Sequence, residues 1–126
     1  MSDKEYKILI VDDTEYCRDI MKEISTNLGY SSECSNDGEI ALNRLKEMNE
    51  EGTLPDLVIS DIQMPRKNGI ELRKESLILF PNLKFLMMSA TIEIYKSELK
   101  TLNVPYMSKS YKINELENKL NKILLK

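Results

Sequence analysis

The sequence contains no histidine, no tryptophan and only two cysteines, and these absences exclude several kinds of active site. Without histidine, neither a serine–histidine–aspartate triad nor a cysteine–histidine pair can form. A zinc enzyme is disfavoured as well, because histidine and cysteine are the usual zinc ligands. The two cysteines, Cys17 and Cys34, are too few for a disulfide framework. This cysteine usage is typical of a reducing, cytoplasmic setting.

Long apolar runs are also missing. The first residues, MSDKEYK, are polar, so no secretory signal is predicted, and no segment approaches the roughly 20 apolar residues of a membrane span. The chain has 126 residues, of which 41% are hydrophobic and 31% charged. We therefore expect one soluble domain over residues 1–126, without membrane insertion and without room for an attached output domain.

Charge is distributed unevenly along the chain. The formal net charge is −3, which gives no reason to expect direct binding of nucleic acid. Residues 1–90 carry 11 basic and 17 acidic side chains, whereas residues 91–126 carry 7 basic and 4 acidic ones. The acidic part is therefore expected to hold any cation site, and the basic part to meet an acidic partner.

Apolar residues follow two alternating periods. Continuous apolar runs such as Ile8–Val11 are typical of buried parallel strands, and each is followed by apolar residues at helical spacing. Five such repeats predict an α/β domain, a doubly wound parallel sheet with helices on both faces. Gly29 is placed to end the first helix, and Pro105 puts the last strand at a sheet edge. The expected strands cover residues 8–11, 30–34, 57–60, 85–88 and 104–107.

Polar residues come directly after three of these strands and shortly after a fourth. Asp12 and Asp13 follow the first strand, Asp61 the third and Ser89 the fourth, while Lys109 comes shortly after the fifth. In an open parallel sheet the site lies beyond the carboxyl ends of the strands, so these side chains should converge. Each alone has an ordinary explanation as a helix cap or a solvated residue. Their occurrence at successive strand ends favours a functional site.

Three carboxylates in one hollow repel one another, and a divalent cation removes the conflict. Oxygen ligands without histidine or cysteine favour Mg²⁺, which binds one or two carboxylates together with phosphate. A carboxylate beside the metal can also be a nucleophile that forms an aspartyl-phosphate. The developing phosphoryl charge then needs the metal, a lysine and a short hydroxyl, and all of these groups are predicted here.

These residues resemble a known family along the whole chain. The segments ILIVDDTEYCR, DGEIAL, LVISDIQMPRKNGIEL, MMSA and YMSK resemble the motifs of the receiver domain of two-component response regulators, in particular the stand-alone, chemotaxis-regulator-like type. The arginine of the first segment is Arg18, and the spacings among its acidic, hydroxyl and lysine positions suit the family. The resemblance implies a flavodoxin-like fold with five strands in the order 2-1-3-4-5.

The resemblance also implies roles for the residues at the strand ends. Asp61 would be the phosphoacceptor and would contact Mg²⁺. Asp12 and Asp13 would organise the metal, one directly and one mainly through water, and Gln63 would contribute its backbone carbonyl. Ser89 and Lys109 would bind phosphoryl oxygens beside the small residue Ala90.

Further positions match the parts of the family that control the signal. Ser89 and Tyr106 match the switch pair, and Gln63 and Thr91 match positions that flank the path of attacking water and tune phosphoryl lifetime. Pro65 and Gly69 would shape the loop after the third strand, Gly69 by permitting a backbone angle that other residues resist. Ser110 stands where the family commonly has proline, so a trans peptide is expected after Lys109.

The leading function is a stand-alone switch, not an enzyme in its own right, that a sensor histidine kinase phosphorylates on Asp61. The signal would pass to a downstream target protein or, in a relay, to a histidine phosphotransfer protein. An aspartyl phosphohydrolase is disfavoured because Gln63 occupies the place of its second aspartate, and a purely docking receiver is disfavoured by the intact site. The expected partner face comprises the fourth helix, fifth strand and fifth helix, with these candidate contacts: Lys96, Lys100, Lys112, Lys119 and Lys122.

Overall fold

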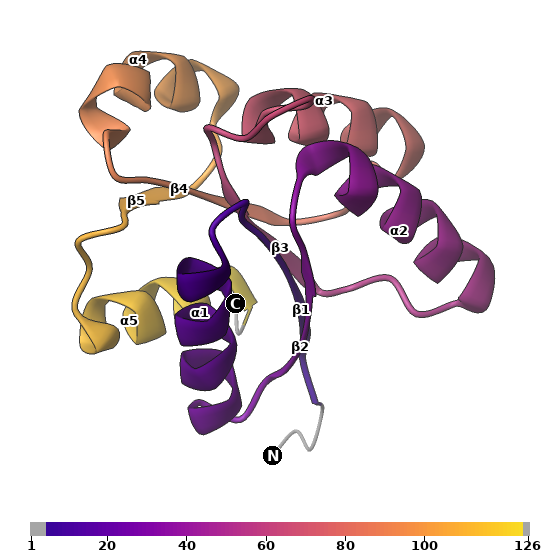
Figure 1. Ribbon diagram of the computed structural model, residues 1–126, viewed down its shortest axis with the longest axis horizontal. Helices are drawn as coiled ribbons and strands as arrows, with labels where there is room; N and C mark the ends of the chain where they lie inside the picture. Colours follow the sequence, from indigo (N-terminus) through magenta and orange to yellow (C-terminus); the bar gives the residue numbers. More distant parts are fainter. Residues whose placement is uncertain (1–4, 125–126) are drawn as a thin grey trace.

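A computed structural model describes residues 5–124. Residues 1–4, part of the first segment in which no secretory signal was predicted, lie outside the described range. Five strands form one parallel sheet (Figure 1). Their order is β2-β1-β3-β4-β5, which confirms the predicted doubly wound topology. The strands are β1 (Lys7–Val11), β2 (Ser31–Ser35), β3 (Leu57–Asp61), β4 (Phe85–Ser89) and β5 (Tyr106–Ser108).

Five helices alternate with the strands and cover both faces of the sheet. Figure 1 shows α1 and α5 on one side and α2, α3 and α4 on the other. No helix in the described range is both long and apolar enough to cross a membrane. The helices are α1 (Glu15–Asn27), α2 (Gly38–Glu51), α3 (Gly69–Leu79), α4 (Ile92–Leu102) and α5 (Ile113–Leu124).

The alternation of side chains along the strands divides the core into two layers. Ile8 and Ile10 of β1 pack with residues of α1 and α5, whereas Leu9 and Val11 pack with residues of α2, α3 and α4. The central strands β3 and β4 are buried along their whole length, as expected of a strand covered on both faces. The core therefore fixes β1, β3 and β4 firmly, and these strands carry the site.

The predicted strand ends agree with the structure to within one residue, except at the start of the last strand. The last strand begins at Tyr106, not at Val104, so Pro105 precedes β5. Proline has no backbone N–H for the ladder, and here only its carbonyl is used, accepting from Met87 N at 3.0 Å. β5 is an edge strand, as predicted. Gly29 follows the end of α1 in the left-handed region at φ +92°, a conformation that suits glycine.

Candidate functional site

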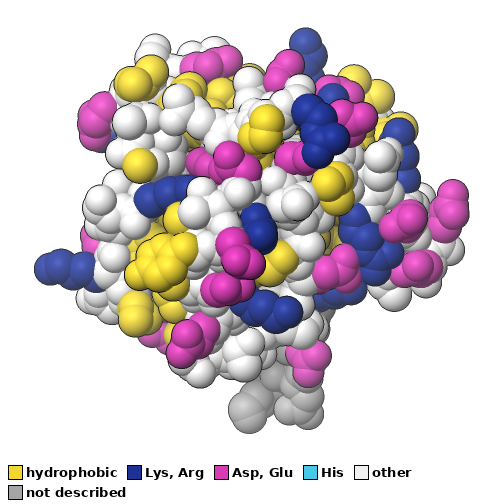
Figure 2. All heavy atoms as spheres, viewed as in Figure 1, with side chains coloured by type: hydrophobic (Ala, Val, Ile, Leu, Met, Phe, Trp, Pro, Cys, Tyr) yellow, Lys and Arg dark blue, Asp and Glu magenta, His cyan; other side chains and the backbone are white. Residues whose placement is uncertain are grey.

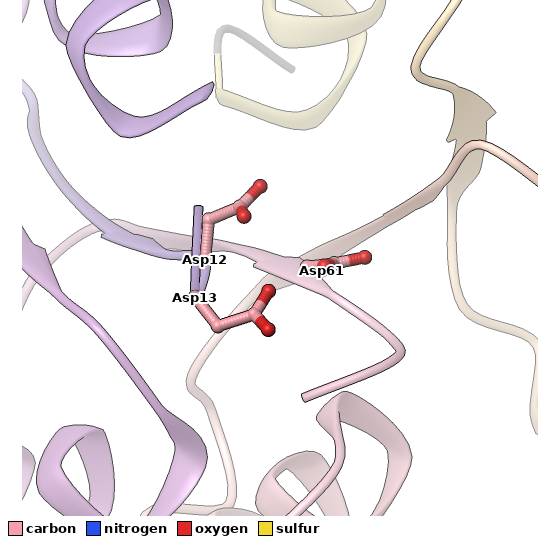
Figure 3. Close-up of side chains that lie close together, drawn as sticks. All are labelled: Asp12, Asp13 and Asp61. Carbon is pink, nitrogen blue, oxygen red and sulfur yellow. The ribbon is translucent and has the colours of Figure 1, made fainter. Parts of the chain in front are cut away.

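The three predicted carboxylates meet at the carboxyl edge of the sheet. Asp12 and Asp13 follow β1, and Asp61 ends the neighbouring strand β3 (Figure 3). Each residue offers one carboxylate oxygen within a set whose members lie within 4.8 Å of one another. Asp12 and Asp61 are buried, and Asp13 is exposed. Parallel pairing of β1 with β3 thus brings together residues that are far apart in the sequence.

Lys109 lies between the two buried carboxylates. Its Nζ is 2.7 Å from Asp12 Oδ2 and 3.3 Å from Asp61 Oδ2. Asp12 Oδ1 accepts a hydrogen bond from the backbone N–H of Thr14 at 2.9 Å, and Arg18 donates to the Asp12 backbone carbonyl at 2.8 Å. Both oxygens of Asp12 are therefore engaged by the protein, which leaves Asp13 and Asp61 as the more available carboxylates.

Burial and neighbouring charges shift the pKa values of Asp61 and Lys109. Burial, together with the charges of Asp12 and Asp13, raises the pKa of Asp61 to about 6, although Lys109 acts in the opposite direction. Burial alone would lower the pKa of Lys109, but its bond to Asp12 and the charge of Asp61 outweigh burial and raise it. Negative charge on Asp61 is thus costly until more positive charge arrives.

The donor set fits Mg²⁺. Its side chains offer carboxylate oxygens, the ligands that Mg²⁺ prefers, and three acids are clustered beside Lys109. Asp13 also lines an open hollow together with Ile62, Gln63 and Met64, the first residues after Asp61. The segment that was predicted to offer the Gln63 carbonyl therefore lies beside the acidic cluster.

Ser89, Thr91 and Gln63 form a second polar group next to Asp61. Ser89 Oγ accepts a hydrogen bond from Thr91 N at 3.0 Å and lies 3.2 Å from Thr91 Oγ1. Thr91 Oγ1 in turn donates to Gln63 Oε1 at 3.5 Å. Ser89 is fully buried at the end of β4, whereas Thr91 and Gln63 are exposed. The predicted switch serine thus contacts one of the two predicted lifetime residues.

Tyr106 is half-buried on β5 and packs against the core layer of α2, α3 and α4. It lines one hollow with Lys96 and Lys119, and another with Lys100. Lys96 is paired with Glu93 at 2.6 Å. Lys122 lines a third hollow, of which Tyr106 is not a lining residue, so the predicted lysines do not all surround Tyr106.

One prediction for the loop between β3 and α3 is wrong. Gly69 is not in the left-handed region; it starts α3, and a Cβ there would lie 2.3 Å from the Asp61 backbone oxygen. Gly69 is therefore needed for close approach. The left-handed residue of this loop is Arg66, at φ +66°.

In the loop after β5, the peptide bond between Lys109 and Ser110 is trans, as predicted.

Sequence reasoning missed a cavity of about 180 Å³ beside Asp61. Asp12, Asp61 and Lys109 line one side of it, and the remainder is mainly apolar, with Ile20 of α1 and Tyr111 before α5 among the lining residues. Figure 2 shows apolar side chains gathered between α1, α5 and β5. The helical spacing of Tyr16 and Ile20, which puts both on one side of α1, was the available signal.

Known proteins resemble the chain in sequence and structure. The chain is 34% identical over 125 residues to the chemotaxis protein CheY of Thermotoga maritima, covering 93% of this chain and 96% of that protein. It is 30% identical over 120 residues to sporulation initiation phosphotransferase F of Bacillus subtilis, covering 94% and 93%. Two other bacterial regulators are longer, and the chain spans 54% and 23% of them.

Solved structures give the same result. The response regulator protein TrrA of Thermotoga maritima, in complex with Mg²⁺ and beryllofluoride, superposes with a TM-score of 0.82 at 32% identity, over 94% of this chain and 99% of that one. The sequence profile of the response regulator receiver domain matches residues 8–121. The chain belongs to the family of response regulator receiver domains.

Proposed function

We propose that the chain is a phosphorylation switch in which Asp61 accepts a phosphoryl group from the phosphohistidine of a sensor histidine kinase. The observation that carries this proposal is the buried Asp61 carboxylate at the end of β3, 3.3 Å from the Lys109 ammonium and clustered with Asp12 and Asp13. The site thus holds a nucleophile, a cation for the phosphoryl oxygens and two further acids for a metal.

In the proposed transfer, a carboxylate oxygen of Asp61 attacks phosphorus. An O–P bond forms, the P–N bond to the kinase histidine breaks, and its electron pair returns to the imidazole. The product is an acyl phosphate, so Asp61 must be ionised and its neighbours must neutralise the incoming charge. From the chain itself, Lys109 would supply positive charge, and the Ser89 hydroxyl would donate a hydrogen bond to a phosphoryl oxygen.

Asp13, Asp61 and the Gln63 backbone carbonyl would hold Mg²⁺, with Asp12 acting mainly through water because Lys109 and Thr14 already occupy its oxygens. The metal, when bound, supplies positive charge to the carboxylates and the transferred phosphoryl group. A beryllofluoride complex of Mg²⁺ is known for the relative TrrA, which supports the same chemistry here.

The switch would operate through Ser89 and Tyr106. To reach a phosphoryl oxygen, the Ser89 hydroxyl must give up its contacts with Thr91, and its movement would open space toward Tyr106. Tyr106 is half-buried and could then turn inward, burying apolar area and reshaping the face made by α4, β5 and α5. Phosphorylation would thereby change what this face binds.

Gln63 and Thr91 would set how long the phosphoryl group survives. Both are exposed polar residues, and their side chains are hydrogen-bonded to each other at 3.5 Å beside Asp61. A water molecule that attacks the acyl phosphate must pass such groups, so their size and polarity control its approach.

In this proposal residues 1–126 act as a stand-alone receiver in the cytoplasm. It is a phosphoacceptor that assists its own phosphorylation and dephosphorylation, and it signals through a downstream target protein. The similarity to the chemotaxis protein CheY over 96% of that protein supports a signalling role.

A relay is the second candidate. Sporulation initiation phosphotransferase F is matched over 93% of its length, and its name describes a protein that transfers phosphoryl groups. In a relay, Asp61 would pass its phosphoryl group to a histidine phosphotransfer protein. The acyl phosphate is the same in both cases, and only its acceptor differs.

Intact mass after incubation with acetyl phosphate tests the phosphoacceptor directly. The protein should gain one phosphoryl group in Mg²⁺ and none in excess chelator, because the carboxylate cluster needs the metal. Asp61→Asn should gain nothing, and Asp19→Asn, an exposed acid on α1, should behave as the wild type.

Modification of Asp61→Asn, or equal modification with and without metal, would contradict the proposal. Incubation with purified histidine kinases and a phosphotransfer protein then separates the two candidates. Rapid loss of label to the phosphotransfer protein favours the relay, and retention of label favours the stand-alone switch.

A further inference from the structure

The loop from Ile62 to Asn68 connects the end of β3 with α3 and begins directly after Asp61. It carries Gln63, whose backbone is proposed to face the metal. The loop is closed at its base by a hydrogen bond from Gly69 N to the Ile62 carbonyl at 2.8 Å. A capping box between Asn68 and Glu71 fixes the start of α3. One end of the loop is therefore held by its own helix.

The other side of the loop lies against the beginning of α2. A Cβ on Gly38, the first residue of α2, would lie 2.3 Å from the Lys67 carbonyl oxygen, so backbone touches backbone there. At Gly69, a Cβ would lie equally close to the Asp61 carbonyl oxygen. Two backbone contacts thus link α2 to the loop and the loop to Asp61. Neither contact leaves room for a side chain.

An ion pair joins the same two segments. Arg66 donates from a guanidinium nitrogen to Asp37 Oδ2, and Asp37 Oδ1 accepts from Ile40 N at 2.8 Å as the cap of α2. The Asp37 side chain is only 3% exposed, whereas that of Arg66 is 60% exposed. Burial raises the pKa of Asp37, but the Ile40 N–H and Arg66 outweigh burial and lower it. The carboxylate is therefore charged, buried and dependent on this arginine.

Arg66 adopts an unfavourable backbone conformation to make this contact. Its φ of +66° is in the left-handed region, which is unfavourable for a residue with a Cβ. Ion pairs between exposed groups contribute little, but a pair that serves a buried carboxylate contributes more, because an unpaired buried charge is penalised. The ion pair offsets the backbone cost, so the conformation of the loop depends on a residue that does not touch the proposed metal or phosphoryl group.

We propose that Arg66 is a positioning residue: through Asp37 it pins the loop after β3 to α2 and so sets the affinity of the Asp61 site for Mg²⁺. This inference rests on the proposed metal site. Metal ligands are held in place by surrounding contacts, and loss of such contacts typically weakens metal binding by tenfold or more. Because Arg66 acts one step further away, its loss is expected to weaken Mg²⁺ binding about threefold to tenfold.

The test uses the full chain and two readouts that need no phosphorylation. Titration with MgCl₂, followed by amide NMR of residues near Asp61, gives the metal affinity. Amide hydrogen exchange of residues 62–68 in chelator gives the mobility of the loop. Arg66→Ala should weaken Mg²⁺ binding and speed exchange in the loop, and it should also lower the thermal unfolding midpoint because the buried Asp37 carboxylate loses its partner. Arg66→Lys, which keeps the charge, should restore most of the affinity.

Asp37→Asn provides an independent test because asparagine still caps α2 but carries no charge. It should reproduce the effect of Arg66→Ala, and the double variant should be no worse than either single one, since both remove the same interaction. Lys67→Ala is the matched control: it lies in the same loop and pairs with Glu75 of α3 at 2.5 Å. Its metal affinity should stay near that of the wild type.

Unchanged loop exchange and unchanged metal affinity in Arg66→Ala would overturn the inference, as would an equal loss in Lys67→Ala. An effect on the unfolding midpoint alone would show a purely structural pair and would also overturn it. If the wild type itself binds no Mg²⁺, the proposed function fails instead. Loop exchange in chelator then still reports whether Arg66 holds the loop.

Discussion

The loops that follow β3 and β4 flank the same site but are held very differently. The loop after β3 is fixed by two backbone contacts at glycine, a capping box and an ion pair to α2. The loop after β4 has no side-chain cap at Thr91, and its side-chain hydrogen bonds connect Ser89, Thr91 and Gln63 with one another. Backbone contacts cannot be exchanged, whereas hydroxyl hydrogen bonds can re-form with a phosphoryl group.

This difference assigns separate tasks to the two loops. In the proposed function, the first would hold Asp61 and the proposed metal ligands in one geometry, as the chemistry requires. The second contains the groups that must move if the signal is to reach β5, so its contacts are weak and local. The comparison predicts that changes in the first loop affect stability and chemistry together, and that changes in the second affect mainly lifetime and signalling.

The largest effect is expected from Gly69→Ala. The new methyl group would meet the Asp61 carbonyl oxygen at 2.3 Å, and the backbone at the end of this fully buried strand has little room to move aside. We expect a loss of about 1–3 kcal/mol in the free energy of unfolding, measured by urea denaturation, together with greatly reduced phosphorylation.

Gly52→Ala is the control for this substitution. Gly52 is left-handed at φ +73°, but nothing lies within 4 Å of the place that a Cβ would take, so only the backbone cost of roughly 1 kcal/mol applies. Phosphorylation of this variant should be normal. Equal behaviour of the two variants would mean that the close contact with Asp61 has no special importance.

Asp61→Asn is expected to have a smaller effect and, without metal, to stabilise the folded protein. Burial beside Asp12 and Asp13 raises the pKa of Asp61 to about 6, so its negative charge destabilises the folded protein at neutral pH. Removing the charge should increase the free energy of unfolding by about 1–2 kcal/mol in chelator. In Mg²⁺ the wild type should recover, because metal binding stabilises the folded state and the variant lacks a ligand.

The stability difference between the wild type and Asp61→Asn should depend on pH. The folded pKa lies above the value of about 4 that is typical of an unfolded aspartate, so the penalty is complete above about pH 6. It fades as the pH falls toward about 4, where Asp61 is protonated in the folded protein. Denaturation curves of wild type and Asp61→Asn in chelator should therefore converge at acidic pH. A constant difference would show that charge is not its cause.

Effects in the loop after β4 should be kinetic. Thr91→Ala removes a hydroxyl that contacts both Ser89 and Gln63, yet Thr91 is exposed and does not cap α4, so stability should change by less than about 0.5 kcal/mol. The dephosphorylation rate should change several-fold in this variant and in Gln63→Ala, as followed by intact mass. Unchanged decay in both would separate these residues from the path of attacking water.

Much of this arrangement follows from the sequence because it depends on periodicity and on strand ends. The apolar run Ile8–Val11 predicted a buried strand, and the parallel order then placed Asp12, Asp61 and Lys109 together. The residue at which β5 begins was less predictable. A short edge strand buries little, so its start at Tyr106 depends on the proline before it and on pairing with β4.

The details of the loop after β3 could not be predicted in the same way. Gly69 was expected to need an unusual backbone angle, but its role is close approach to Asp61, which depends on a residue beyond its own turn. In the sequence, Arg66 is indistinguishable from an ordinary surface arginine. Its left-handed conformation and its contact with Asp37 exist only when α2 lies beside the loop. Local patterns do not encode such tertiary contacts.

The smallest expected effect is also the one that decides whether the loop after β4 transmits a signal. Spectra of the free and beryllofluoride-bound protein, both in Mg²⁺, should differ at Ser89 and Thr91, at the Tyr106 ring and along α4, because Ser89 exchanges its contact with Thr91 for the phosphoryl mimic. The coupling energy need only be about 1–3 kcal/mol. In the loop after β3, shifts should be confined to residues next to the ligand, since its backbone is fixed. Shifts near Asp61 alone, with Tyr106 and α4 unchanged, would leave a phosphoacceptor without this switch and would favour the relay.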